Sequence, residues 1–311
     1  MSDYIIEAEN LIYSYPDGTQ ALKGINIKIL KGKKVAVLGS NGAGKSTLFL
    51  HCNGILKPQQ GIVKYDGREV RYDRKSLLQL RKNVGIAFQD PDSQLFSASV
   101  YQEISFGPLN FGLPEETVRK RVEQAMSATE VAGLKDKPTH MLSYGQKKRV
   151  SIADILAMEP EVIICDEPTA WLDPKHAQQT VKLFDRINSS GTTIMMSTHD
   201  VDLAYSWADY IFVLSNGEVI GEGIPEQVFT NEILIKKADL EKPWLVQVSE
   251  VLLIKGCLPK EAVLPRNRES LFELIINHDT NVGEEDVIND FGDFRNKGRE
   301  RNHISADLKG L

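Results

Sequence analysis

The sequence is poor in cysteine. Its 311 residues contain only three, Cys52, Cys165 and Cys257, which lie far apart and include no Cys-x-x-Cys pair. An odd number of widely separated cysteines argues against a disulfide framework. Cys165 lies in an apolar run, where a thiol packs as a small hydrophobic side chain. We therefore expect three reduced thiols.

Long apolar runs and an excess of positive charge are also absent. No apolar stretch is long enough to span a bilayer, and the chain opens with Met-Ser-Asp-Tyr rather than a basic and then apolar leader. The net charge is −6, which is the opposite of a general nucleic-acid footprint. We therefore expect a cytosolic protein without a nucleic-acid partner.

The chain has enough apolar residues for a full core. Hydrophobic residues make up 41 % and charged residues 26 % of the sequence, as in ordinary soluble globular proteins. Because 311 residues exceed the usual span of one domain, we expect one main domain with a smaller appendage.

A glycine-rich segment is the most informative motif. It follows an apolar run at 35–38 and precedes a stretch that we expect to be helical from about Lys45. In such a strand-to-helix turn, backbone N–H groups point at phosphate oxygens. The lysine reaches the β and γ phosphates of a nucleotide, and the next hydroxyl binds Mg²⁺. The predicted ATP-binding residues of this loop are Gly39, Ser40, Asn41, Gly42, Ala43, Gly44, Lys45, Ser46 and Thr47.

Strand-like runs surround this loop. Two runs within residues 5–29 flank a Pro-Asp-Gly turn and predict an antiparallel hairpin. Near-continuous apolar runs at 162–165 and 193–197 are typical of parallel strands that are covered on both faces. Asn216-Gly217 lies between two further runs and predicts a second hairpin. The pattern as a whole predicts an α/β fold.

Helical patterns divide the rest of the chain. Residues of about 91–142 predict a helical subdomain inserted into a main domain of 1–238, with one helix starting after Pro114. Short helical stretches separated by prolines predict a small C-terminal extension over 239–278. Residues 279–311 have few large apolar side chains and blocks of charge, which predicts a flexible tail, with a docking segment as the alternative.

Two carboxylates follow the strand at 162–165. Ligands of parallel sheets bind at the carboxyl ends of the strands, which is where Asp166 and Glu167 lie. We expect Asp166 to hold Mg²⁺, directly or through water. Glu167 is the candidate that polarises the water attacking the γ phosphate.

A second motif precedes that strand and consists of Leu142, Ser143, Tyr144, Gly145 and Gln146. The run resembles the signature of the nucleotide-binding subunits of ABC transporters, and the resemblance covers about residues 4–235. It implies an α/β phosphate-loop NTPase of ABC type: a mixed parallel sheet core with an antiparallel β subdomain and an inserted helical subdomain, plus a small C-terminal extension. The family more often has glycine where Tyr144 stands, and a glycine-only backbone angle there would cost about 1 kcal/mol or more.

The resemblance assigns further roles. Tyr15 resembles the aromatic residue that stacks on adenine, with Tyr13 as the competing candidate. Gln89 resembles the glutamine that touches Mg²⁺ and the attacking water, and His199 the histidine that contacts the γ phosphate. Asp173 resembles the aspartate that communicates across a dimer. The expected cofactors are ATP and Mg²⁺.

The resemblance also implies a dimer. In the family one nucleotide is completed by two chains, so we expect a head-to-tail pair that encloses two ATP molecules. Ser143 and Gly145 would then face the γ phosphate of the opposite subunit. The second ATPase subunit is either an identical chain or a homologous one.

Residues 88–96 and 103–110 resemble the subfamily of energy-coupling factor importers. The resemblance implies a transmembrane coupling protein and a membrane substrate-binding protein as partners, at the cytoplasmic face of the membrane. We expect Leu95, Phe96 and Phe106 to line a groove for the coupling protein, with core packing as the alternative. Cobalt is the cargo that the closest likeness implies, and nickel, biotin or another vitamin are alternatives.

Two other functions are weighed against this one. A soluble ABC ATPase of DNA repair or translation would have a long coiled-coil insertion or two cassettes, and the sequence has neither. A phosphate-loop kinase or GTPase would leave the motif at 142–146 and His199 without a role.

Overall fold

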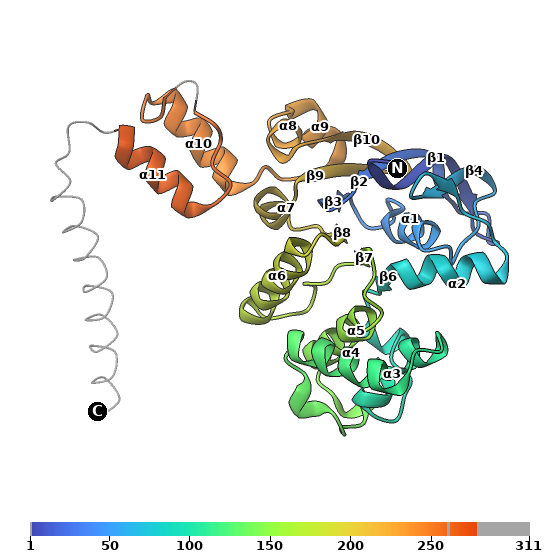
Figure 1. Cartoon of the computed structure of the whole chain (residues 1–311). Coiled ribbons are helices and arrows are strands. Elements are labelled where there is room, and N and C mark those ends of the chain that lie inside the picture. Colours follow the sequence, from blue (N-terminus) through green and yellow to red (C-terminus); the bar gives the residue numbers. More distant parts are fainter. Residues whose placement is uncertain (1, 260–261, 279–311) are drawn as a thin grey trace, which may run out of the picture. The chain divides into compact units, whose positions relative to one another are not determined.

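Two β-sheets form the centre of the main unit. The computed structural model describes residues 2–259 and 262–278 (Figure 1). The larger sheet has the order β10-β9-β3-β8-β7-β6. Its neighbours from β9 to β6 are parallel, and β10 pairs antiparallel with β9. Its strands are β3 (Lys34–Leu38), β6 (Val84–Ala87), β7 (Val162–Cys165), β8 (Thr193–Ser197), β9 (Tyr210–Ser215) and β10 (Glu218–Gly223).

The smaller sheet is antiparallel, with the order β2-β1-β4-β5. Its strands are β1 (Tyr4–Ser14), β2 (Gln20–Leu30), β4 (Gln60–Tyr65) and β5 (Arg68–Glu69). Gly18 N donates to Tyr15 O at 2.9 Å and closes the β1–β2 turn. Both predicted hairpins are thus confirmed, and the two sheets together confirm the predicted mixed sheet and antiparallel subdomain.

One hydrophobic cluster joins the two sheets to α1 (Lys45–Cys52). Leu48 and Phe49 of this helix are completely buried beside residues of both sheets. Every side chain of β7 and β8 is buried as well, as their unbroken apolar sequences predict. Because this core fixes β3 and α1 together, it also fixes the glycine-rich loop that connects them.

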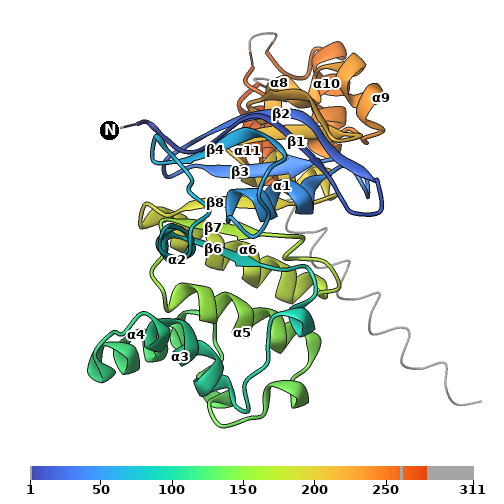
Figure 2. The same cartoon turned by 90° about the vertical axis from the view of Figure 1, so that its right-hand side faces the viewer.

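A second hydrophobic cluster belongs to the helical subdomain. It joins α3 (Val100–Asn110), α4 (Glu115–Ala128) and α5 (Tyr144–Leu156). Figures 1 and 2 show these helices grouped together, on the side of the larger sheet away from the antiparallel strands. The helix expected after Pro114 is confirmed as α4. The buried residues that α5 contributes to this cluster pack it against α3 and α4.

The remaining helices cover the larger sheet or form a separate unit. The main unit also contains α2 (Arg74–Asn83), α6 (Pro174–Ser189), α7 (Val201–Trp207), α8 (Pro225–Phe229) and α9 (Glu232–Ala238). It ends at Pro243, and a second compact unit begins at Trp244. That unit contains α10 (Trp244–Ile254) and α11 (Arg268–His278). The tail predicted over 279–311 lies outside the described residues.

The three cysteines are free thiols. Burial raises the pKa of Cys52 and of Cys165 to about 12, so neither is a thiolate near neutral pH. Cys257 is exposed. The packing role expected for Cys165 in an apolar strand agrees with its complete burial in β7.

Gly61 of β4 should be indispensable to the antiparallel sheet. Its φ is +84°, and a Cβ there would lie 2.3 Å from Asn10 O and 2.4 Å from Glu9 O. We expect Gly61→Ala to lower the free energy of unfolding by about 2–4 kcal/mol, because backbone strain and a steric clash add. Gly18→Ala is the control, since its φ of +89° is similar but its surroundings are open. Urea unfolding of the two variants should show the larger loss for Gly61→Ala, and equal losses would contradict the clash.

Candidate functional site

The glycine-rich loop connects β3 to α1 at the carboxyl ends of the parallel strands. Gly39, Gly42 and Gly44 have φ values of +149°, +80° and +101°. A Cβ on Gly39 would lie 2.3 Å from Leu214 O, and one on Gly44 would lie 2.7 Å from Ala21 O. The loop therefore needs glycine at these two positions for close packing as well as for its backbone angles.

Lys45 places a buried positive charge at this loop. Its Nζ donates to Gly39 O at 2.7 Å and to Ser40 O at 3.1 Å. Burial lowers the pKa of Lys45, while the negative charges of Glu167 and Asp166 oppose that shift. Lys45 thus lies within electrostatic range of both carboxylates. Ser46, the next residue, is exposed to solvent.

Tyr15 is hydrogen-bonded to α1. Its hydroxyl and Thr47 Oγ1 share a hydrogen bond of 3.0 Å, and its ring packs edge-on against Tyr13 with centroids 5.2 Å apart. Tyr13 packs in turn against His51 and the core. The geometry favours Tyr15 over Tyr13 as the ring that a nucleotide base would meet, because Tyr13 is occupied by core contacts.

Asp166 and Glu167 follow β7 and are both buried. Ser197, at the end of the adjacent strand β8, donates its hydroxyl to Asp166 Oδ1 at 2.5 Å. Ser197 Oγ also accepts from Glu167 N at 2.9 Å. Glu167 itself has a left-handed φ of +45°, a conformation that costs about 1 kcal/mol or more in a residue with a side chain. One serine hydroxyl therefore orients both carboxylate residues.

His199 lies beside the carboxylate of Glu167. Its Nδ1 is 3.3 Å from Glu167 Oε2, and its ring is largely exposed. The fold thus brings together two residues that are 32 positions apart in sequence, because β7 and β8 are parallel neighbours.

Sequence reasoning missed two residues of this cluster, Ser197 and Lys148. Lys148 is buried, and its Nζ donates to Glu167 O at 2.6 Å. Burial lowers the pKa of Lys148 to about 8, against the opposing negative charges of Glu167 and Asp166. A lysine two residues after Gln146 gave no signal by itself. Ser197 could have been found from its place at the end of an apolar run that pairs with β7.

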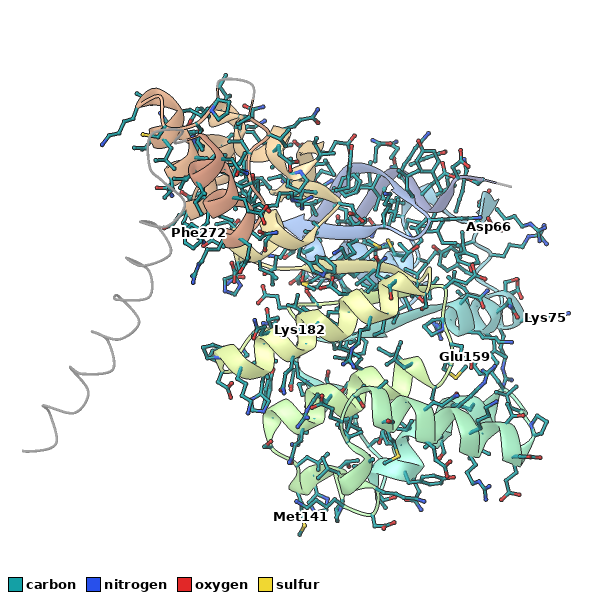
Figure 3. All side chains as sticks on the ribbon, turned by 60° about the vertical axis from the view of Figure 1, so that its left-hand side comes forward. Asp66, Lys75, Met141, Glu159, Lys182 and Phe272 are labelled. Atoms are coloured by element: carbon teal, nitrogen blue, oxygen red, sulfur yellow. The ribbon has the colours of Figure 1, made fainter. Side chains whose placement is uncertain are left out.

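The motif at 142–146 lies at the start of α5. Ser143 caps the helix by accepting from Gln146 N at 3.4 Å, and Gln146 Oε1 accepts from Ser143 N at 3.0 Å. Tyr144 is the first helical residue and is not among those with positive φ, so no glycine-only angle is strained by its side chain. Met141, just before the motif, lies at the outer end of the helical subdomain (Figure 3).

The motif does not reach the glycine-rich loop of its own chain. Among the described residues, no hydrogen bond or ion pair joins Ser143 or Gly145 to residues 39–47. Tyr144 instead donates its hydroxyl to Gln89 O at 2.9 Å. Gln89 is exposed and follows β6, which places it at the same sheet edge as Asp166.

Asp173 caps α6, and the residues before it form an exposed turn. His176 N donates to Asp173 Oδ1 at 3.0 Å, and its ring Nδ1 is 2.5 Å from Asp173 Oδ2. Trp171 has a left-handed φ of +63° and is 83 % exposed. Leu172 approaches the signature, since its Cδ2 would lie 3.4 Å from a Cβ on Gly145.

Comparison with known proteins identifies the family. Residues 22–170 match the family described as ABC transporter. The energy-coupling factor transporter ATP-binding protein EcfA of Methanocaldococcus jannaschii is 52 % identical over 258 residues, which cover 83 % of this chain and 92 % of the relative. The chain belongs to the ABC transporter ATP-binding proteins of the energy-coupling factor type. EcfA3 of Clostridium perfringens is 51 % identical over 253 residues, covering 81 % and 89 % of the two chains.

Solved structures agree with this assignment. The structure of cbiO1 from Clostridium perfringens, part of the ABC transporter complex cbiONQ, is 50 % identical with a TM-score of 0.69, covering 81 % of this chain and 99 % of that one. A bacterial ABC transporter cassette solved as a dimer is 29 % identical with a TM-score of 0.66, covering 71 % and 99 %. The predicted ABC ATPase fold is thus confirmed, and so is the predicted activity, that of an ATP-binding ATPase coupled to transport.

Membrane-spanning helices and clustered metal ligands are both absent from the part of the chain that the structure describes. None of their helices is both long and apolar enough to cross a membrane. None of their histidine, cysteine, aspartate and glutamate side chains form a group of three or more that could hold a metal ion.

Substitution of Ser197 tests whether its hydroxyl orients the two carboxylates. Ser197→Ala removes a hydrogen bond to a charged carboxylate, so we expect kcat for ATP hydrolysis to fall about tenfold or more, with the nucleotide affinity nearly unchanged. Ser189→Ala is the matched control, because its hydroxyl donates to Arg186 O at 2.7 Å in the exposed last turn of α6. A steady-state ATPase assay with a separate nucleotide titration decides the point. Equal kcat values in the two variants would contradict it.

Proposed function

We propose that this chain is the ATP-hydrolysing motor subunit of an energy-coupling factor importer at the cytoplasmic face of the membrane. The observation that carries the proposal is the convergence of the glycine-rich loop, Asp166, Glu167 and His199 at one edge of the larger sheet. Family membership supplies the coupling to transport, and the geometry supports a role for each residue.

ATP would lie over residues 39–47, with its phosphates at the N-terminus of α1 and at Lys45. Lys45 Nζ now contacts loop carbonyls, and it would turn to the β and γ phosphates. Tyr15 would stack on the adenine. Ser46, Gln89 and Asp166 present a hydroxyl, an amide and a carboxylate, the hard oxygen donors that suit Mg²⁺. Bound there, Mg²⁺ would neutralise phosphate charge.

Glu167 is the proposed general base. Its carboxylate is buried beside His199, its main chain is held by Ser197 and Lys148, and so its position is fixed before a nucleotide arrives. Glu167 would take a proton from the water that attacks the γ phosphate, with Gln89 orienting that water. His199 would contact the γ phosphate.

The signature would act on a second subunit. Because Ser143 and Gly145 do not reach the loop of their own chain, we propose that they bind the γ phosphate held by the partner. The positive end of the helix dipole at the N-terminus of α5 suits an anion. Two chains arranged head to tail would then enclose two ATP molecules, with Asp173 at the contact. The partner is an identical chain or a homologous ATPase.

Glu167→Gln should trap this dimer. We expect the variant to bind ATP, to hydrolyse it at least a hundredfold more slowly, and to form a long-lived dimer by light scattering. Trp171, exposed in the single chain, should report the closure by a change in tryptophan emission that Trp171→Phe abolishes. Lys45→Ala is the control that should neither bind ATP nor dimerise. Normal hydrolysis by Glu167→Gln would exclude Glu167 as the base.

A groove on the helical subdomain is the proposed docking site for the transmembrane coupling protein. Its exposed apolar residues are Phe96, Phe106 and Leu109, which are 65 %, 47 % and 54 % exposed. The rings of Phe96 and Phe106 pack edge-on with centroids 4.8 Å apart. Leu95 packs against the helical core instead, so we assign core packing to Leu95 and propose the docking role for the two phenylalanines.

The groove is held in shape by a buried carboxylate. Glu103 of α3 is almost fully buried, and its Oε2 accepts from Phe96 N at 3.0 Å and from Ser97 N at 2.6 Å. This fixes the backbone that carries Phe96 against α3, which carries Phe106. A rigid apolar pair of this kind suits a helix of a partner protein.

Cobalt is the proposed cargo, with nickel, biotin or another vitamin as alternatives. The support is the family resemblance and the likeness to cbiO1 of the cbiONQ complex. The cargo would be bound by the separate membrane substrate-binding protein, and this subunit would supply the energy of ATP binding and hydrolysis.

Loss of the phenylalanine pair should uncouple the motor. We expect the tagged chain, purified from its own membranes in mild detergent, to bring with it a coupling membrane protein and a small substrate-binding membrane protein. Phe96→Ala with Phe106→Ala should lose both partners and transport while the ATP-dependent dimer still forms. Ile233→Ala, an apolar residue of α9 that is 82 % exposed, is the control and should keep the partners. Recovery of soluble partners only would indicate a non-transport ATPase.

A further inference from the structure

The first turn of α5 is tied to two loops of the nucleotide site. Tyr144 donates its hydroxyl to Gln89 O at 2.9 Å, and Lys147 Nζ pairs with Asp92 Oδ1 at 2.5 Å. Residues three positions apart in a helix lie on one face, so these two contacts hold one face of the turn against the segment after β6. Lys148 holds the loop after β7 through Glu167 O.

The segment after β6 is itself a compact unit. The Asp90 side chain accepts from Asp92 N at 3.0 Å, and Ser93 Oγ donates to Asp90 O at 2.6 Å. A 3₁₀ turn over Pro91–Ser93 follows directly. Because these bonds join Asp90 to Asp92 and Ser93, a displacement of Gln89 shifts both partners of α5, the Gln89 carbonyl and the Asp92 carboxylate.

We propose that Tyr144 is a positioning residue that couples the two nucleotide sites of the dimer. This inference rests on the proposed function, in which Gln89 meets the nucleotide of its own chain and the signature meets that of the partner. Tyr144 belongs to the signature and holds the main chain of Gln89 through a single oxygen atom. A movement of Gln89 that accompanies nucleotide binding in one site therefore carries Ser143 and Gly145 with it toward the other site.

The chemistry of Tyr144 suits this role. The phenol is partly buried between the two segments, with Lys148 Nζ 5.8 Å from the ring centroid. Burial raises the pKa of Tyr144, as do the negative charges of Asp90 and Asp92, so the hydroxyl stays protonated and can donate. Glycine, the more frequent residue in the related signatures, has no side chain for this bond.

Tyr144→Phe removes the hydroxyl and keeps the ring. We expect a Hill coefficient for ATP hydrolysis above 1 in the native protein and one closer to 1 in Tyr144→Phe. We also expect kcat to fall about fivefold in the variant, which corresponds to one neutral hydrogen bond. The affinity of the single chain for a fluorescent ATP analogue should stay within twofold. Tyr65→Phe is the matched control, because Tyr65 donates to Glu161 Oε2 at 2.8 Å before the start of β7, at the opposite sheet edge.

The outcomes separate this inference from the proposed function. Cooperative hydrolysis that is equal in the native protein, Tyr144→Phe and Tyr65→Phe would overturn the coupling role and leave the motor intact. A native protein without ATP hydrolysis would overturn the proposed function first. Lys147→Met removes the second tie and should lower the Hill coefficient in the same direction. If Tyr144→Phe does not fold, an unchanged Hill coefficient in Lys147→Met overturns the proposal.

Discussion

Strands β3, β8, β7 and β6 run parallel to one another, and this alignment determines where the functional residues lie. Parallel strands end at a common edge. The loop after β3, the carboxylates after β7 and the histidine after β8 therefore lie at the same edge, although they are far apart in the sequence. The pairing of Cys165 with Met196 puts Ser197 beside Asp166, where one hydroxyl serves two acids. The antiparallel sheet and α1 add the core that keeps the glycine-rich loop in register with this edge.

Charge balance explains why this edge can be buried. Lys45, Lys148, Asp166 and Glu167 are all largely removed from water, and an unpaired charge at such depth costs several kcal/mol. Each lysine is attracted electrostatically by both carboxylates. Each also donates hydrogen bonds to backbone carbonyl oxygens. The two cations and two anions thus compensate one another.

The sequence was sufficient for the strands, the hairpins, the glycine-rich loop and the helical insertion, because each depends on local patterns. The apolar runs of β7 and β8 predicted buried parallel strands, and Asn216-Gly217 predicted the last hairpin. The roles of Ser197 and Lys148 could not be predicted from the sequence, because their partners, Asp166 and Glu167, are 31 and 19 positions away. The strand order and the placement of the helix had to be known first. The bond from Tyr144 to Gln89 spans 55 positions and joins two subdomains, which no local pattern encodes.

The helical subdomain links the proposed docking groove to the signature. Phe106 lies on α3, which packs against α5 in one hydrophobic cluster, and Glu103 fixes the chain at Phe96 to the same helix. Close-packed cores transmit displacement rather than absorb it. A membrane partner that presses on the groove would therefore move the N-terminus of α5, and with it Ser143, Tyr144 and Gly145. Tyr144 also holds Gln89. The helical subdomain would therefore respond to the nucleotide at one end and to the membrane partner at the other, which is the arrangement that a transport motor requires.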